Sequence, residues 1–214
     1  MQIFTSFSQL IFPSRCISCK RLGDSICLSC KRFWSHRLFR STTKQKSELS
    51  IYSSIEYSDV ATKIILAAKE SHIKSADYLV AEAVSFSLQQ WFRNEWIDTL
   101  IPIPSRRSVA RKRGRQFIEE ISTVAAQESG HRVAPILTHS RVIRDQSGLG
   151  AQERWNNLDG SMVVKGNPRG LGKVLLVDDL VTTGATLSEA ARALRYAGIE
   201  VIGAVTAAIA QPVR

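Results

Sequence analysis

Residues 174–187 read VLLVDDLVTTGATL, and this stretch decides the fold class of the chain. It opens with four apolar residues, Val174 to Val177, which have the length and β-branched content of a buried strand. Two adjacent carboxylates, Asp178 and Asp179, follow. A run of small residues then leads into LSEAARALRYAG (187–198), whose helical spacing ends on a glycine. The pattern predicts a strand, an acidic pair, a small-residue loop and a helix.

The small-residue loop consists of Thr182, Thr183, Gly184, Ala185 and Thr186. Such a loop exposes backbone N–H groups and hydroxyls at a helix N-terminus, where a phosphate group is favoured. The two carboxylates at the strand end can accept hydrogen bonds from vicinal hydroxyls. A ligand with one phosphate and a nearby cis-diol fits both halves, which indicates a ribose 5-phosphate. The alternative is a strand that ends in an Asx turn before an ordinary helix cap.

This combination resembles the signature of the type I phosphoribosyltransferases, which bind phosphoribosyl pyrophosphate (PRPP). The resemblance implies that Asp178 and Asp179 meet the ribose 2- and 3-hydroxyls, and that residues Thr182 to Thr186 wrap the 5-phosphate. Hypoxanthine-type members usually carry an aspartate, thought to act as a base, at the position of Thr182. The threonine therefore counts against that subgroup.

All four cysteines lie in one short stretch with the pattern C-x2-C-x7-C-x2-C. Two such pairs supply the four thiolates of a closed, structural zinc site, which leaves no open position for catalysis. Gly23 and Asp24 suit the tight turn that the short spacer requires. Disulfides and a redox-active CxxC are the alternatives, but a cytoplasmic chain disfavours the first and no thioredoxin-like unit supports the second. The predicted zinc ligands are Cys16, Cys19, Cys27 and Cys30.

The chain has 214 residues, which suits one main domain with a small appendage. Residues 1–35 form the predicted zinc knuckle, 36–50 a linker or hairpin, and 51–214 the main domain. In 51–214, predicted helices alternate with apolar strands, which favours an α/β fold with a parallel sheet flanked by helices. Trp91 and Trp96, on either side of a helix end, are expected in the core.

The order of these features also resembles the ComF family, which includes competence proteins of DNA uptake and the related GntX proteins. Family members usually show Arg-Gly-Phe-Asn-Gln in the basic segment, whereas this chain reads Arg-Gly-Arg-Gln-Phe at 113–117. The change removes or moves an aromatic and two amides, adds a cation and keeps the positive field. The segments that carry the resemblance are FPSRCISC (12–19), the four cysteines, the Pro-flanked strand 99–104, RKRG (111–114), the residues Gln146, Leu149, Glu153, Arg154 and Asn157, and the loop 182–186.

The formal net charge is +10, and much of it lies in residues 1–47 and in SRRSVARKRGR (105–115). Two local positive fields suggest polyanionic ligands, either pyrophosphate or nucleic acid, although a charged surface can also serve solubility alone. Phosphoribosyl transfer needs cations around the leaving pyrophosphate and a magnesium ion shared with the ribose hydroxyls. Arg106 and Arg107 are placed to meet pyrophosphate if strand 99–104 neighbours strand 173–177. Lys69 is a further candidate, or simply a helix-dipole partner.

Residues 144–157 contain two glycines and lie between predicted elements. They predict a mobile hood over the site, with Arg144, Gln146 and Arg154 as contacts, or else an ordinary surface loop.

Three functions are consistent with these sequence features. The first is PRPP-dependent phosphoribosyl transfer to an unknown acceptor. The second is a non-catalytic competence or DNA-uptake factor that binds single-stranded DNA or senses PRPP. The third is a zinc-knuckle module whose partner is another protein, such as a component of DNA uptake. No apolar run is long enough to span a membrane, and residues 1–12 lack a basic n-region, so a cytoplasmic location is expected.

Overall fold

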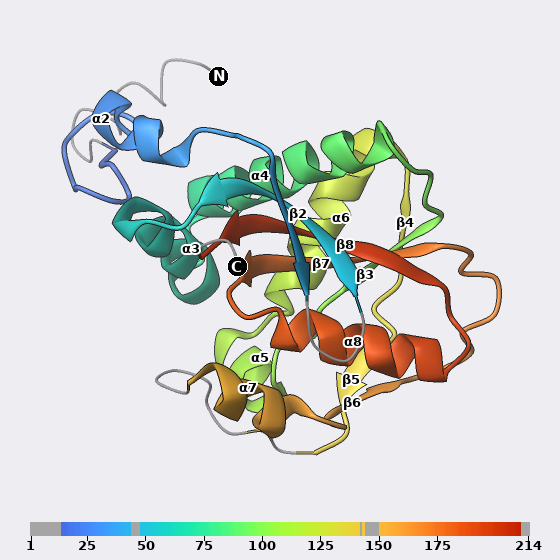
Figure 1. The fold of residues 1–214 in the computed structure, drawn as a ribbon. Helices are drawn as coiled ribbons and strands as arrows, with labels where there is room; N and C mark the ends of the chain where they lie inside the picture. Colours follow the sequence, from blue (N-terminus) through green and yellow to red (C-terminus); the bar gives the residue numbers. More distant parts are fainter. Residues whose placement is uncertain (1–13, 44–47, 142, 144–149, 211–214) are drawn as a thin grey trace, which may run out of the picture.

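A six-stranded sheet in the order β1-β2-β8-β7-β3-β4 lies at the centre of the structure (Figure 1). The structure is a computed structural model that describes residues 14–43, 48–141, 143 and 150–210. Strands β2, β8, β7, β3 and β4 are parallel, and only β1 runs antiparallel to its neighbour. This confirms the predicted α/β fold with a mostly parallel sheet.

The elements follow one another from the cysteine-rich segment to the last strand. Their bounds are α2 Leu28–Lys31, η1 Arg32–Trp34, β1 Phe39–Thr43, β2 Leu49–Glu56, α3 Asp59–Ser71, α4 Lys74–Phe92, β3 Thr99–Pro102, α5 Arg107–Arg113, α6 Phe117–Ser129, β4 Arg132–Val133, β5 Leu137–His139, α7 Ala151–Leu158, β6 Met162–Val164, β7 Val174–Val181, α8 Ala185–Tyr196 and β8 Val201–Ile209.

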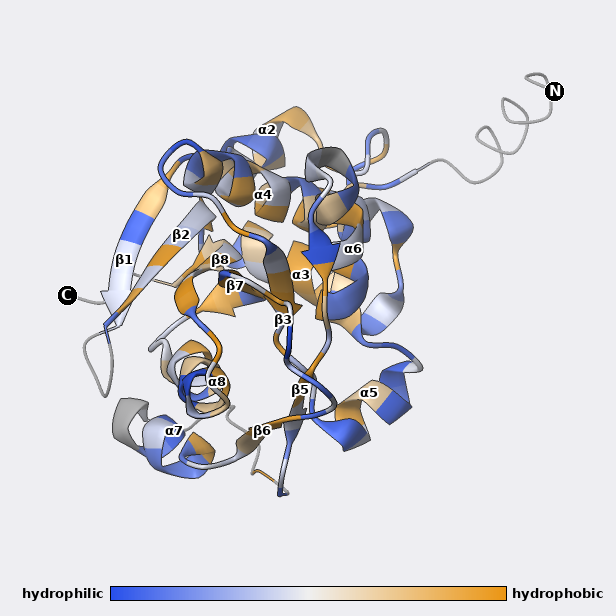
Figure 2. Ribbon diagram, turned by 90° about the vertical axis from the view of Figure 1, so that its right-hand side faces the viewer, coloured by the Kyte–Doolittle hydropathy of each residue, from blue (hydrophilic) through white to orange (hydrophobic). Residues whose placement is uncertain are grey.

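Helices cover both faces of the sheet, with α3, α4 and α6 on one side and α8 on the other (Figure 1). Alternate residues of β7 serve the two cores: Leu175 and Val177 face the first group of helices, and Val174 and Leu176 face α8. Figure 2 shows the apolar residues concentrated on β7 and β8 in the middle of the molecule. Because both faces are covered, these strands are apolar throughout rather than alternating.

Gly203 in β8 lets a tryptophan lie directly on the sheet. A Cβ at this position would lie 2.0 Å from Cη2 of Trp91, which is buried in α4. The Trp91 ring also packs against Tyr52 of β2, with a centroid distance of 4.7 Å. The prediction for Trp96 was wrong, because its side chain is 70% exposed and lies beside His131 after α4 has ended.

A second, two-stranded sheet of β5 and β6 carries α7 and lies on the α8 side of the molecule (Figures 1 and 2). Buried Glu189 of α8 holds this β5–α7–β6 unit, because its Oε1 accepts from the backbone N of Met162 at 2.8 Å. Arg192 of α8 pairs with Glu189 and donates to the Met162 carbonyl at 3.0 Å. The cysteine-rich segment lies on the other side, where Ile17 and Trp34 join the core formed by α3 and α4.

No helix among the described residues combines the length and the apolar character needed to cross a membrane.

Candidate functional site

The carboxyl edge of the sheet opens between β3 and β7. The backbone N of Ile103 still donates to the Val177 carbonyl at 2.9 Å, but the next residue, Pro104, has no N–H to donate. Beyond Val177, β7 continues to Val181 paired with β8 alone. Asp178 and Asp179 therefore lie inside a strand that is longer than predicted, on the edge that β3 has left.

A cleft of about 500 Å³ lies at this edge, and we call it the β7 cleft. Its walls come from the ends of β2 and α3, the β3–α5 connection, α7 and the start of α8. Tyr57, directly after β2, and Ser105, in the β3–α5 connection, were not among the predicted site residues. The lining residues are Tyr57, Lys69, Ile103, Pro104, Ser105, Arg106, Val109, Arg113, Ile118, Arg154, Asp178, Asp179, Leu180, Thr182 and Thr186.

Lys69 forms an ion pair with Asp179 at the base of the β7 cleft, with 2.7 Å between Nζ and Oδ2. Burial opposes ionisation of Asp179, which is 4% exposed, but the Lys69 ammonium holds its pKa below the usual value. Burial and the neighbouring carboxylate raise the pKa of Asp178 well above its usual value. Burial alone would lower the pKa of Lys69, but the two carboxylates raise it. The ion pair therefore favours the ionised form of Asp179, whereas burial and the neighbouring charge favour the neutral form of Asp178.

Contacts from α5 and from the connection after it fix the end of α3 that carries Lys69. Arg113 at the end of α5 pairs with Glu70, and its carbonyl lies 2.7 Å from Nε2 of His72. Arg115 donates to the Ala68 carbonyl at 2.6 Å. These contacts hold Lys69 within reach of Asp179. Lys69 therefore has a role beyond compensating the helix dipole at the end of α3.

Arg115 does not add to the positive field of segment 105–115, contrary to expectation. Its guanidinium makes two hydrogen bonds to the carboxylate of Asp77, at 2.8 and 2.7 Å, and a third to Glu120 at 3.0 Å. It also lies 5.1 Å from the ring centroid of Phe117. Its carboxylate partners offset its charge, and the residue joins α4, α6 and the end of α3.

The predicted phosphate loop turns sharply at Gly184, which has φ +76° and precedes α8. A Cβ at Gly184 would meet Cγ2 of Thr43 at 2.6 Å, so both the conformation and the space require glycine. Thr182 and Thr186 line the β7 cleft, whereas Gly184 and Ala185 are buried. The hydroxyl of Thr183 accepts from the Ala185 amide at 3.4 Å.

The predicted cations divide between two cavities. Arg106 lines the β7 cleft, as does Arg154 of α7, which donates to the Thr182 hydroxyl at 3.0 Å. Strands β3 and β7 are neighbours, which was the condition for the predicted placement of Arg106 and Arg107. Arg107 lines a separate cavity of about 270 Å³ that shares Arg106 with the cleft. Arg144 and Gln146 lie outside the described residues.

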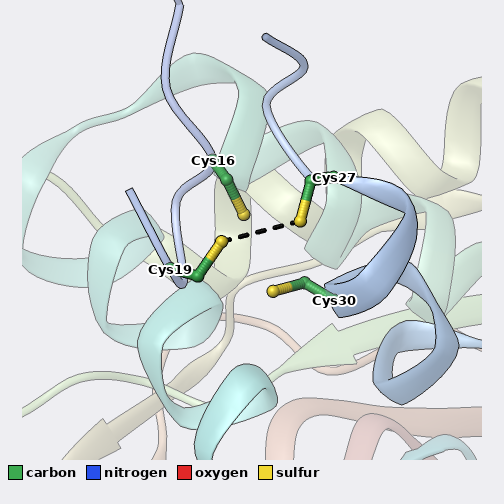
Figure 3. A group of neighbouring side chains, drawn as sticks. All are labelled: Cys16, Cys19, Cys27 and Cys30. Carbon is green, nitrogen blue, oxygen red and sulfur yellow. Dashed lines mark hydrogen bonds between the residues drawn. The ribbon is translucent and has the colours of Figure 1, made fainter. Parts of the chain in front are cut away.

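The four cysteine side chains converge on one point, as Figure 3 shows. Their sulfur atoms all lie within 4.8 Å of one another, and those of Cys19 and Cys27 are 3.6 Å apart. Tetrahedral zinc with Zn–S bonds of about 2.3 Å needs sulfurs about 3.8 Å apart, so the geometry fits a metal of this kind. Burial and the three neighbouring thiols raise the pKa of Cys30 to about 12. Four thiolates at this spacing would repel one another unless a cation lay between them, and the cluster could hold a metal ion.

Comparison with known proteins agrees with the resemblance drawn from the sequence. The sequence model of the family described as "Phosphoribosyl transferase domain" matches residues 79–213. Competence protein F of Haemophilus influenzae (strain ATCC 51907 / DSM 11121 / KW20 / Rd) is 44% identical over 59 residues. That match spans 27% of this chain and 26% of the relative, about a quarter of each.

The solved structures that resemble the chain at low identity include two adenine phosphoribosyltransferases. An adenine phosphoribosyltransferase is 13% identical, with 84% of this chain and 88% of that chain covered and a TM-score of 0.45. The adenine phosphoribosyltransferase of Saccharomyces cerevisiae, complexed with D-2,5-dideoxy-2,5-imino-altritol 1,6-bisphosphate and adenine, is 12% identical. There the coverage is 85% of this chain and 86% of that chain, and the TM-score is 0.43.

The acidic pair generates a prediction in which two similar substitutions change stability in opposite directions. Asp178→Asn raises the free energy of unfolding at neutral pH by about 1 kcal/mol, because it removes a carboxylate whose ionisation is unfavourable in the folded state. Asp179→Asn lowers it by about 1–3 kcal/mol, because Lys69 loses its partner. Urea unfolding of both variants and the wild type measures the two differences.

The pH dependence checks the cause. The pKa of Asp178 is raised on folding, so the folded protein binds more protons than the unfolded chain between the ordinary and the raised pKa. Stability falls as pH rises through that window. The advantage of Asp178→Asn is therefore complete above the window and disappears below about pH 4. An advantage that stays constant down to that pH would contradict the assignment.

Proposed function

The chain belongs to the phosphoribosyl transferase domain family, and we propose that it binds PRPP or another ribose 5-phosphate ligand, with Mg²⁺, in the β7 cleft. One observation carries the proposal: Asp178 and Asp179, the start of α8 and Arg106 all border a single cleft. The diol of PRPP needs acceptors, its monophosphate needs a helix N-terminus and its pyrophosphate needs a cation. All three must lie within the length of one sugar phosphate.

Each part of the ligand has a candidate partner in the cleft. The ribose hydroxyls donate to the two carboxylates. The 5-phosphate lies against the loop Thr182–Thr186, where Thr182 and Thr186 line the cleft and α8 begins. The pyrophosphate lies toward Arg106 and Lys69. Lys69 then exchanges part of its interaction with Asp179 for one with the ligand, so its charge stays compensated.

The same arrangement supports transfer of the phosphoribosyl group to an acceptor. A nucleophilic atom of the acceptor bonds to C1, the bond from C1 to the pyrophosphate oxygen breaks, and the electron pair leaves with pyrophosphate. The proton lost by the acceptor passes to water. Mg²⁺, when bound, offsets charge on the pyrophosphate and the ribose oxygens. Arg106 and Lys69 stabilise the negative charge that grows on the leaving group.

Magnesium-dependent PRPP binding tests the site. Asp178→Asn combined with Asp179→Asn is expected to abolish binding in calorimetry, because neither position then carries a carboxyl group to bind the ribose diol. Asp24→Asn, an exposed acid of the cysteine-rich segment, serves as the control and keeps the wild-type affinity. Unchanged PRPP affinity in the double variant would refute the assignment. Pyrophosphate release from PRPP across a panel of bases and amines then separates turnover from binding alone.

We further propose that the four cysteines hold a structural zinc ion, and that the protein works in the reducing cytoplasm, where these thiols persist. Cys16, Cys27 and Cys30 are buried, and Val60 of α3 packs against the cluster. A metal there ties the segment to the main fold.

Metal analysis is expected to find about one zinc per chain. Cys30→Ser lowers that ratio and the melting temperature, because three thiolates hold the ion less tightly. Ser25→Ala, in the loop between the two cysteine pairs, is the control and leaves both unchanged. Purified wild type with disulfide-bonded cysteines and no metal would sink the proposal.

A second candidate function, binding of single-stranded DNA, draws support from a groove of about 330 Å³ beside the β7 cleft. Arg37 lies 5.6 Å from the ring centroid of Phe39 there, and Phe33 is exposed. Tyr57 lines both the groove and the cleft. Cations interleaved with aromatic rings suit a strand whose bases stack and whose phosphates are neutralised.

Binding of oligo(dT) measured against salt concentration tests this candidate. Arg37→Ala is expected to weaken binding and to reduce the slope of log K against log salt by about one. Phe33→Ala weakens binding with little change in slope, because it removes stacking only. Arg40→Ala, on β1 but outside the groove lining, is the control. Equal affinity in all three variants and the wild type would remove the groove from consideration.

A further inference from the structure

The cavity that shares Arg106 with the β7 cleft has no role in the function proposed above, and we call it the arginine cavity. It lies between the start of α5 and the end of β5, and its volume of about 270 Å³ is just below the usual range for ligand pockets. Its described lining residues are Arg106, Arg107, Ser108, His139, Ser140, Arg141 and Ile143.

Three guanidinium groups and no carboxylate occur among these described lining residues. Arg141 is held in place, because its Nη2 donates to the carbonyls of Asn157 and Asp159 at 2.9 and 3.0 Å. Fixed cations of one sign in a small cavity favour an anion, and guanidinium groups match the planar fork of a carboxylate or the face of a phosphate. The charge of the cavity therefore selects against a neutral ligand.

His139 adds a hydrogen-bond acceptor to this cationic lining. Its side chain is 8% exposed, and its Nε2 lies 3.2 Å from the Pro104 carbonyl, which can only accept. Nε2 therefore carries the proton, and Nδ1 is the acceptor of a neutral imidazole. Within the described part of the chain, this buried Nδ1 has no hydrogen-bond partner.

The neutral state of His139 agrees with its surroundings. Burial lowers its pKa, and Arg106 and Arg107 lower it further, while the Pro104 carbonyl and Glu189 partly offset them. A buried acceptor without a partner is costly, so a ligand that brings an N–H donor gains from filling this position.

We propose that the arginine cavity receives the acceptor of the phosphoribosyl group, and that this acceptor is a small acid of about one ring. Its carboxylate or phosphate meets Arg107 and Arg141, and an N–H beside the acidic group donates to Nδ1 of His139. The inference rests on the proposed function, because it is the shared residue Arg106 that brings such a molecule next to the pyrophosphate end of the β7 cleft.

Matched ring compounds test the chemical class. Orotate and uracil both carry ring N–H groups and differ by one carboxylate, which in orotate lies beside an N–H. In calorimetry, with and without PRPP and Mg²⁺, orotate is expected to bind about tenfold more tightly than uracil. Competition by inorganic phosphate in the PRPP-saturated protein shows whether a phosphate-bearing acceptor fits as well.

Arg107→Ala and Arg111→Ala form the variant pair, since both arginines are exposed on α5 and only Arg107 lines the arginine cavity. Arg107→Ala is expected to weaken binding of the acid about tenfold, and Arg111→Ala to leave it unchanged. Melting temperatures close to wild type establish that both variants fold.

The outcomes separate the two proposals. Equal binding of orotate and uracil, binding of no anion up to millimolar concentration, or equal effects of the two arginine variants would overturn the acid-acceptor inference. Failure of PRPP to bind, with binding of the acid still dependent on Arg107, would overturn the proposed function and leave an anion cavity without a donor substrate.

Discussion

The ion pair between Lys69 and Asp179 is the interaction on which the rest of the candidate site depends. Two adjacent carboxylates at a half-buried strand edge repel each other, and burial penalises each charge. Lys69 offsets the charge of Asp179, and the pKa of Asp178 is raised so that its neutral form is favoured. The lysine comes from the last turn of α3, so this turn must lie next to β7. The contacts of Arg113 with Glu70 and of Arg115 with the Ala68 carbonyl hold it there.

A second constraint is the way β3 and β7 part. Pro104 ends the hydrogen bonding between them, and β7 continues with β8 as its only neighbour. The acidic pair can therefore keep the geometry of a regular strand and still border the β7 cleft. The position of Pro104, in the connection after β3, thus makes the cleft possible.

The sequence predicts the fold and the two motifs well because their signals are local. The alternation of helices with apolar strands, the 174–187 pattern and the cysteine spacing each involve residues close in the chain. The failures concern partners that are distant in sequence. The sequence suggests that Arg115 adds to the positive field, but Asp77, which pairs with it, is distant in the chain, and Glu120 pairs with it as well. It also suggests that Trp96 is buried, but α4 ends before this residue and leaves it exposed. The division of Arg106 and Arg107 between two cavities also depends on how β5 meets α5, which no local pattern encodes.

The two cavities are built from different parts of the chain and share one arginine. The β7 cleft uses the central sheet and the helices against it, whereas the other cavity takes part of its wall from β5, in a small unit attached to α8 through Glu189 and Arg192. Apart from Arg154 of α7, which lines the β7 cleft, residues of that unit can be substituted without changing a contact of the central sheet edge. Such modularity lets descendants of one ancestral gene acquire new specificities by altering a peripheral segment of a few dozen residues.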